Sequence, residues 1–233
     1  MPKKVFDEYA EKYDQWFLKN RLVLESELSL FAYFLNKPGR ALSVGCGSGL
    51  FEMLLKQNYN VVIQEGIDPS AEMVEIATKR GMNARVGSAE SIDFDNEIFD
   101  TVIYNGTPSY IDDLKSAFLE GYRITKKGGH ILVIDVAKES SYAMLYNLAM
   151  VLGDWNHPLL EGIAPENPYP IEFVKAANWR TTQEKIDLLK DVGFINFKFA
   201  QTLTRHPLYT NDVQEEASEG YDRGDYVAIY GQK

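Results

Sequence analysis

Residues Ala41–Leu50, ALSVGCGSGL, decide the fold of this chain. A short run suited to a buried strand ends in three glycines at alternate positions, Gly45, Gly47 and Gly49, and the apolar pattern of a helix begins at Leu50. Glycine lets the backbone turn tightly and approach a ligand, and the free amides at a helix start point toward it. The stretch therefore predicts a site for an electron-rich or anionic group, although an ordinary strand-to-helix connection has the same local pattern.

An acid stands at the end of the next predicted strand, Val61–Asp68, which leads into a helix that Gly81 ends. Asp68 lies 19 residues after Gly49. At that spacing a carboxylate can accept hydrogen bonds from the ribose hydroxyls of a nucleoside ligand. An acid just before a helix is also a common cap. The sequence leaves both roles open for Asp68.

Strands and helices alternate through the following residues. Further strands are predicted at 84–87, 99–105 and 130–135. Such alternation gives an α/β fold whose mostly parallel sheet is covered by helices on both faces. Ligands of these sheets bind at the carboxyl ends of the strands, which is where Gly45, Asp68, Ser88 and Asn105 all fall. We therefore expect one pocket to collect them.

Two long segments lie outside this alternation. Residues 5–35 predict helices with aromatic rings on one face, and residues 140–180 hold an apolar helix followed by aromatic and proline-rich stretches. Both segments suit packing on the core, but rigid rings and long ordered loops also suit the wall of a pocket. We predict one domain over residues 1–233, in which residues 1–38 form an N-terminal helical lid and residues 140–180 form an inserted segment that covers the substrate.

Composition narrows the class of protein. The formal net charge of -10 argues against a nucleic-acid partner, because phosphate backbones require a basic face. The single Cys46 excludes an intrachain disulfide and any zinc-ligand spacing, so no metal site is expected. The beginning of the chain does not resemble a signal peptide, and no apolar run is long enough to span a membrane. We expect a cytoplasmic protein without membrane insertion, and the oligomeric state stays open.

Several short motifs follow one another in a fixed order after the glycine turn. Asp68 follows the second strand, Gly-Ser-Ala-Glu at 87–90 follows the third, Phe-Asp at 99–100 opens the fourth, and Lys-Lys-Gly-Gly at 126–129 precedes the fifth. This ordered set resembles the class I S-adenosylmethionine-dependent methyltransferases, and is most similar to the small-molecule branch with the ubiquinone/menaquinone-biosynthesis-type enzymes. The resemblance implies a Rossmann-like, mostly parallel sheet of seven strands in the order 3-2-1-4-5-7-6, with strand 7 antiparallel. Residues 195–199 and 226–230 supply its last two strands.

The resemblance also implies the cofactor, S-adenosyl-L-methionine, and the residues that hold it. By position these are Tyr13, Gly45, Cys46, Gly47, Gly49, Asp68, Pro69, Met73, Ser88, Ala89, Glu90, Asn105 and Gly106. Asp68 would hold both ribose hydroxyls, and Tyr13 would close the site from the N-terminal helix. Two positions depart from the family pattern: Ser43 stands where Asp or Glu is usual, and Ser88 where Asp is common. A hydrogen bond to a neutral acceptor contributes about half as much as one to a charged acceptor, so these two serines predict a modest affinity for the cofactor.

The methyl acceptor is less well marked. The aromatic, Met-rich segment suggests a small, partly apolar organic molecule. If that molecule must lose a proton, the candidate bases are His157, Tyr110 and Tyr9, although a histidine in a surface loop is the ordinary explanation of His157. The Asn-Pro-Pro-Tyr motif of amino-directed methyltransferases is not present, because Asn-Gly-Thr-Pro-Ser-Tyr stands at 105–110. An amino acceptor therefore has no support from the sequence.

Two other functions stay open. An NAD(P)-dependent oxidoreductase needs a third glycine three residues after the second, and counted from Gly47 that position is Leu50. A non-catalytic S-adenosylmethionine-binding module is the other alternative, because a fold does not guarantee chemistry.

Overall fold

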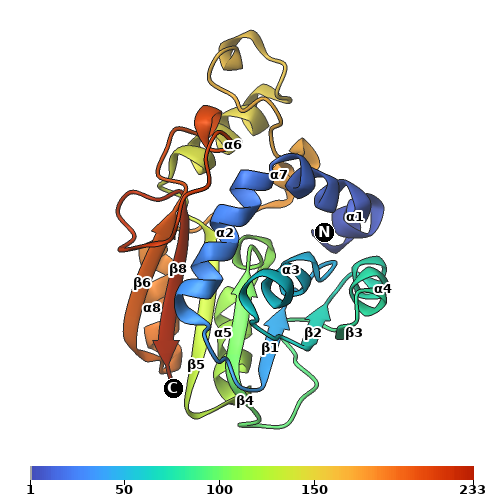
Figure 1. The fold of residues 1–233 in the computed structure, drawn as a ribbon, viewed down its shortest axis with the longest axis vertical. Helices are drawn as coiled ribbons and strands as arrows, with labels where there is room; N and C mark the ends of the chain where they lie inside the picture. Colours follow the sequence, from blue (N-terminus) through green and yellow to red (C-terminus); the bar gives the residue numbers. More distant parts are fainter. Residues whose placement is uncertain (1) are drawn as a thin grey trace.

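The computed structural model describes residues 2–233, with side chains from residue 5 onward. One sheet runs through it, with helices on both faces (Figure 1). The helices of this part are α1 (Pro2–Lys19), α2 (Arg21–Phe34), α3 (Leu50–Tyr59), α4 (Ala71–Lys79), α5 (Leu114–Ile124), α6 (Ser141–Leu152), α7 (Ile171–Ala176) and α8 (Thr182–Val192), with the 3₁₀ turns η1 (Pro108–Tyr110), η2 (Pro158–Leu160) and η3 (Pro207–Tyr209). Within residues 2–233, no helix combines the length and the apolar character that crossing a membrane requires.

The sheet has eight strands in the order β3-β2-β1-β4-β5-β8-β6-β7. They are β1 (Ala41–Val44), β2 (Glu65–Asp68), β3 (Asn83–Val86), β4 (Phe99–Asn105), β5 (Thr125–Val136), β6 (Ile195–Thr202), β7 (Ser218–Glu219) and β8 (Tyr226–Gln232). The first five are parallel, and β8 lies antiparallel between β5 and β6. The predicted order is confirmed, with β8 in the place of strand 7. The predicted number of strands is wrong by one, because β7 is a two-residue edge strand in the acidic connection and carries no alternation of its own.

The central strand β1 shows why the sheet is covered on both faces. All four of its residues are buried. Ala41 belongs to the hydrophobic cluster that includes Leu28 of α2 and Leu55 of α3, whereas Leu42 belongs to the cluster that includes Phe118 of α5. Successive side chains of a strand point to opposite faces, so a strand between two helical layers is buried on both faces. The one polar residue of β1, Ser43, is 1% exposed and donates its hydroxyl to Glu52.

The segments outside the alternation form more helix than the sequence predicts. Residues 5–35 are the two helices α1 and α2, joined at Asn20, whose side-chain amide donates to the carbonyl oxygen of Trp16 at 3.0 Å. The proline-rich stretch expected as loop ends at Pro170, and α7 follows it directly; the six residues of α7 are too few to show a period. α8 begins with a capping box between Thr181 and Glu184, in which the backbone amide of each residue donates a hydrogen bond to the side chain of the other.

Candidate active site

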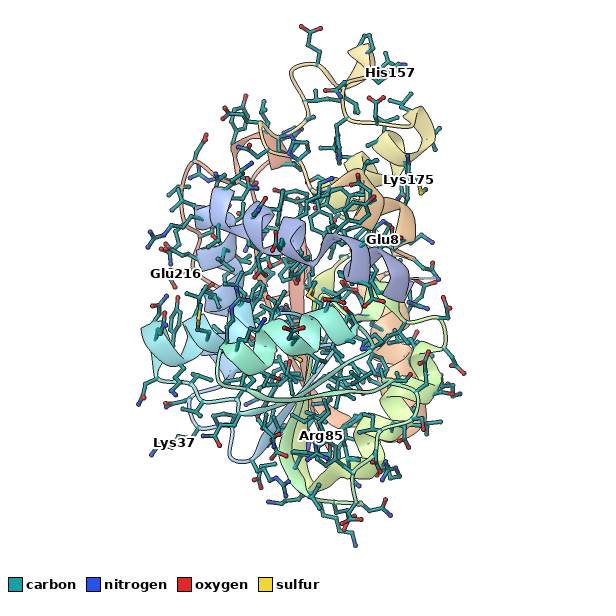
Figure 2. The ribbon with its side chains drawn as sticks, turned by 90° about the vertical axis from the view of Figure 1, so that its right-hand side faces the viewer. Glu8, Lys37, Arg85, His157, Lys175 and Glu216 are labelled. Carbon is teal, nitrogen blue, oxygen red and sulfur yellow. The ribbon has the colours of Figure 1, made fainter. Side chains whose placement is uncertain are left out.

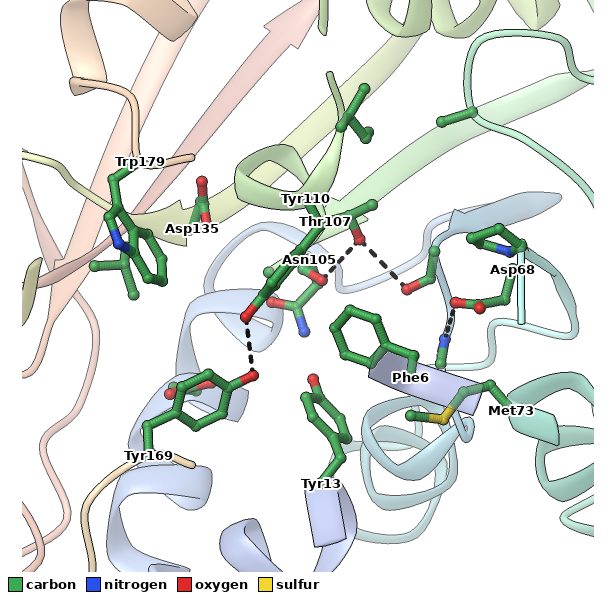
Figure 3. Close-up of a pocket in the computed structure, with 18 of the residues that line it drawn as sticks. Phe6, Tyr13, Asp68, Met73, Asn105, Thr107, Tyr110, Asp135, Tyr169 and Trp179 are labelled. Carbon is green, nitrogen blue, oxygen red and sulfur yellow. Dashed lines mark hydrogen bonds between the residues drawn. The ribbon is translucent and has the colours of Figure 1, made fainter. Parts of the chain in front are cut away.

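A cavity of about 250 Å³ lies at the carboxyl ends of the parallel strands, and residues of α1 close it on the opposite side (Figure 3). Two groups of residues line it. The strand-end group consists of Gly45, Gly47, Asp68, Pro69, Met73, Gly87, Ser88, Ala89 and Glu90. The aromatic group consists of Phe6, Tyr13, Trp16, Phe17, Tyr110, Tyr146, Tyr169, Trp179 and Tyr226, together with the acids Glu27 and Asp135. In Figure 3, Asp68 and Met73 lie on one side of Phe6 and Tyr13, and Trp179 and Asp135 lie on the other.

The glycine turn forms the floor of the strand-end group. Gly45 has a φ of +71°, and a Cβ added there would lie 2.4 Å from Cγ2 of Thr107. No other residue fits, because Thr107 donates its hydroxyl to the carbonyl oxygen of Val44 at 3.0 Å and holds the end of β4 against the turn. At Gly47 an added Cβ would meet nothing within 4 Å, so the turn is open on that side.

Two residues predicted to bind the cofactor lie behind the turn. Gly49 precedes α3, and a Cβ there would meet Sδ of Met82 at 2.7 Å. Cys46 is buried and packs with Ala77 and Met82. Neither lines the main cavity, although Cys46 lines a smaller pocket beside the turn, and both let α3 and α4 pack closely beneath it.

Asp68 is held by backbone amides at the end of β2. Its Oδ2 accepts from the amide of Gly47 at 2.9 Å and its Oδ1 from the amide of Ser70 at 2.9 Å. Burial raises the pKa of Asp68 to about 6, and the two amides offset part of that shift. The cap of α4 is Ser70, whose hydroxyl accepts from the amide of Met73 at 3.2 Å, so Asp68 is not the cap. Each carboxylate oxygen can accept a further bond, which fits a pair of ribose hydroxyls.

A carboxylate stands beside each of the two serines that depart from the family pattern. The hydroxyl of Ser43 donates to Oε1 of Glu52 at 2.6 Å, while Oε2 of Glu52 is buried without a partner among the described residues. Burial raises the pKa of Glu52. The hydroxyl of Ser88 donates to Glu90, whose amide donates back to it at 3.3 Å. The modest cofactor affinity was predicted on the assumption that Ser43 and Ser88 are neutral acceptors. The neighbouring Glu52 and Glu90 place a negative charge at both positions when they ionise.

The two lid segments meet above the aromatic group. Phe6 of α1 stacks on Phe173 of α7, with ring centroids 5.0 Å apart. Nε1 of Trp16 donates to the carbonyl oxygen of Asn167 at 2.9 Å. Asn105 at the end of β4 lines the same space, and its Oδ1 accepts from the hydroxyl of Tyr226 at 3.0 Å. Thus α1, β4, β8 and the 140–180 segment all contribute to one enclosure.

Of the three predicted bases, the structure brings only Tyr110 to the cavity. Its hydroxyl lies 3.2 Å from that of Tyr169, and burial raises the pKa of Tyr110 well above its ordinary value, so it stays protonated near neutral pH. His157 lies near the tip of the 140–180 segment (Figure 2), where its Nδ1 accepts from the amide of Leu159 at 3.2 Å and caps η2. Tyr9 sits at a kink of α1 with φ −129° and ψ 26°. His157 and Tyr9 are not among the residues that line the cavity.

Two acids of the aromatic group were missed by the sequence reasoning. Asp135, at the end of β5, accepts from the hydroxyl of Ser109 at 2.8 Å and from Nζ of Lys185 at 3.1 Å. Glu27, from α2, is 5% exposed, and its Oε2 has no hydrogen-bond partner among residues 2–233. The only signal for Glu27 was its spacing from Val23, Leu24, Leu30 and Phe31, which places it on the apolar face of the predicted helix.

Comparisons with known proteins agree with this geometry. Residues 42–133 match the family model described as a methyltransferase domain. The chain is 32% identical over 229 residues to an uncharacterized protein of Methanocaldococcus jannaschii, covering 98% of each chain. It is 24% identical over 208 residues to a ubiquinone/menaquinone biosynthesis C-methyltransferase of Desulfotalea psychrophila, covering 84% of this chain and 83% of the relative. A crystal structure of an S-adenosylmethionine-dependent methyltransferase from Thermotoga maritima, described as a possible histamine N-methyltransferase, superposes with a TM-score of 0.83, 33% identity and 99% coverage of both chains.

None of these matches supports a nicotinamide-dependent oxidoreductase or a module that only binds the cofactor. The matched residues 42–133 run from β1 into β5 and include the glycine turn, Asp68 and the Ser88–Glu90 stretch. From its strand order, its strand-end cavity and these relatives, the chain belongs to the class I S-adenosylmethionine-dependent methyltransferases, and its cofactor is S-adenosylmethionine.

Proposed function

We propose that this protein methylates a small, partly apolar organic molecule enclosed in the aromatic part of the cavity. One observation carries the proposal: a single cavity joins the strand-end group, which suits the cofactor, to a chamber walled by aromatic rings from α1 and the 140–180 segment. A chamber of this kind is the size and character of a small-molecule site.

The strand-end group would hold the cofactor. Asp68 would accept from the ribose hydroxyls, Pro69 and Met73 would pack on the adenine, and Glu90 beside Ser88 would border its edge. Glu52, whose Oε2 lacks a partner, would supply a carboxylate near the glycine turn. When bound, S-adenosylmethionine supplies a methyl group that is already activated on a sulfonium.

The protein itself would have to position the acceptor and exclude water from the site. A nucleophile must be held about 3 Å from the carbon that it attacks, in line with the bond that breaks. The rings of Tyr13, Tyr169 and Trp179 would orient a partly apolar acceptor. The contact between Phe6 and Phe173 keeps α1 and α7 together above it. Tyr110, which keeps its proton, would donate or accept a hydrogen bond rather than act as a base.

Two relatives support a small-molecule acceptor. The Desulfotalea psychrophila relative carries the name of a quinone-biosynthesis C-methyltransferase, and the Thermotoga maritima relative is described as a possible histamine N-methyltransferase. Both names refer to compounds of low molecular mass, which is the class that the enclosed chamber favours.

Ligand binding and label transfer together test the proposal. S-adenosylhomocysteine should raise the melting temperature because it binds the folded state selectively, whereas NAD and NADP should not. Incubation with methyl-labelled cofactor and a cell extract should then place the label in the small-molecule fraction. A shift with NAD alone, or label found only in protein or nucleic acid, would contradict the proposal.

A further inference from the structure

We infer that Glu27 recognises a positively charged nitrogen, and that the methyl acceptor is therefore an amine or a basic nitrogen heterocycle. The inference rests on the proposed function, since it names the class of molecule that the aromatic chamber takes. Glu27 projects from the buried side of α2 and lines the chamber, and none of the described side chains in its wall is a lysine, arginine or histidine.

Glu27 differs from the buried acids Asp14, Asp135 and Asp225 in its lack of a charged or hydrogen-bonding partner among the described residues. Asp14 pairs with Arg80 and Asp135 pairs with Lys185, and Asp225 accepts from the amide of Ser141. The Oε2 of Glu27 is buried without a hydrogen bond, and none of the ion pairs formed by the described residues includes Glu27. A buried carboxyl group without a partner is costly to ionise, and a bound cation removes that cost.

The surroundings of Glu27 also favour a cation. Tyr146 lies 5.2 Å from Trp179 and 5.8 Å from Tyr169, measured between ring centroids, and Tyr226 lines the chamber beside them. Aromatic faces attract ammonium groups, most strongly where water is excluded. Aromatic walls that hold the acids Glu27 and Asp135, of which only Asp135 is paired with a lysine, are complementary to a protonated amine and disfavour an anion. Recognition of nitrogen therefore comes from α2, and not from residues 105–110 where the sequence analysis sought it.

The same carboxyl group can take the proton that the acceptor must lose. For a protonated amine to be methylated, one N–H bond breaks, the electron pair stays on nitrogen, and the proton passes to the carboxylate of Glu27. The N–C bond that then forms would replace the C–S bond of the bound cofactor, whose electron pair would stay on sulfur as S-adenosylhomocysteine leaves. Burial raises the pKa of Glu27, and the charge of Asp135 raises it further, so the carboxylate is a stronger base than an exposed one. The other titratable groups coupled to Glu27 are Tyr13 from α1, Tyr142 and Tyr146 from α6, and Tyr226 from β8. All four are neutral phenols, so they do not replace Glu27 in this role.

The test uses three probes of matched size that differ in charge. Protein saturated with S-adenosylhomocysteine is titrated calorimetrically with 2-phenylethylamine, 2-phenylethanol and phenylacetate. The amine should bind at least about tenfold more tightly than the alcohol, and phenylacetate should bind most weakly. Glu27→Gln should abolish the preference for the amine while leaving the affinity for S-adenosylhomocysteine within about threefold. Glu25→Gln is the matched control, because Glu25 lies on the same helix and pairs with Arg21 at the surface.

Each possible failure has a separate meaning. If the unaltered protein does not bind S-adenosylhomocysteine, the proposed function fails before any amine is added. If it binds S-adenosylhomocysteine but shows no preference for the amine, the assignment of Glu27 is overturned. A loss of S-adenosylhomocysteine affinity in Glu27→Gln would place Glu27 in the cofactor site and would also overturn it. The comparison of probes in the unaltered protein stands even if the variant does not fold.

Discussion

At the scale of single residues, the site depends on acids that are buried and only partly paired. Asp68, Glu52 and Glu27 are all nearly inaccessible to water, and burial raises the pKa of each. They differ in what compensates them: Asp68 has two backbone amides, Glu52 has one serine hydroxyl, and Glu27 has nothing among the described residues. Polar groups of a bound ligand can pair with the carboxylate oxygens of these acids that the described residues leave unpaired.

Asp68 makes the stability of the cofactor-free protein depend on pH. Its pKa is raised from 3.8 to about 6, so the folded state binds the proton more tightly than the unfolded chain. The resulting stabilisation is fully present below pH 3.8 and is lost as the pH rises through about 6. Asp68→Asn removes this titration. Between pH 4 and 7 the unaltered protein should therefore lose roughly 2–3 kcal/mol more unfolding free energy than the variant.

Urea unfolding of both proteins across that pH range measures the difference. Asp212→Asn, at an exposed aspartate, should leave the pH profile unchanged. At pH 7, Asp68→Asn should also weaken S-adenosylhomocysteine binding by about tenfold or more, because the variant loses charge-assisted hydrogen bonds to the ligand. Parallel pH profiles for Asp68→Asn and the unaltered protein would show that Asp68 is not a titrating buried acid.

At the scale of secondary-structure elements, a buried ion pair ties α8 to the end of β5. Lys185 of α8 and Asp135 of β5 have side chains that are each 2% exposed, with Nζ and Oδ2 3.1 Å apart. Nζ also donates to the carbonyl oxygen of Val136 at 3.1 Å. The pair positions β5 where its end lines the chamber, and it neutralises Asp135 there.

Breaking this pair should destabilise the fold strongly. Lys185→Met leaves Asp135 as an uncompensated buried charge, so the free energy of unfolding should fall by roughly 3–5 kcal/mol. The double variant Lys185→Met, Asp135→Asn removes both charges and should recover at least half of that loss. Urea unfolding of the unaltered protein, the single variant and the double variant at pH 7 measures these differences. Equal losses of unfolding free energy in the two variants would refute an electrostatic origin.

At the scale of the whole molecule, the site is closed by two segments far apart in the sequence. α1 and α7 lie side by side at one end of the sheet (Figure 1), joined by the stack of Phe6 on Phe173 and by the ion pair of Lys12 with Glu172 at 3.0 Å. Water would compete with the acceptor if these segments separated, so closure belongs to the proposed function.

Binding of S-adenosylhomocysteine should order both lid segments. Hydrogen exchange in residues 5–19 and 140–180 should slow when the ligand is added, because closure protects amides that open locally in the free protein. Phe6→Ala removes the stacked ring and should reduce the added protection in residues 140–180. Lys12→Met removes only a surface ion pair, worth at most about 1 kcal/mol, and should change little. Identical exchange with and without ligand would mean that the segments are static packing.

The sequence by itself determined the sheet and the part of the site that lies along it. The glycine turn, Asp68 and the ends of β3 and β4 follow directly on buried strands, so their positions come from the period and spacing of adjacent residues. The parallel part of the sheet followed from the alternation of strands and helices, whereas the strand order and the antiparallel place of β8 were implied by the family resemblance. A strand of two residues such as β7 has no period, and it was missed for that reason.

Only the tertiary structure decided which acids enter the chamber. The local sequence made His157 a candidate and did not single out Glu27, yet His157 caps η2 near the tip of the 140–180 segment, whereas Glu27 lies among aromatic rings without a hydrogen-bond partner for its Oε2 in the described residues. The period of apolar residues along a helix tells which of its faces is buried, but it does not tell which neighbouring element packs on that face. The chamber draws on α1, α2, β5, β8 and the 140–180 segment, and long-range packing alone brings these together.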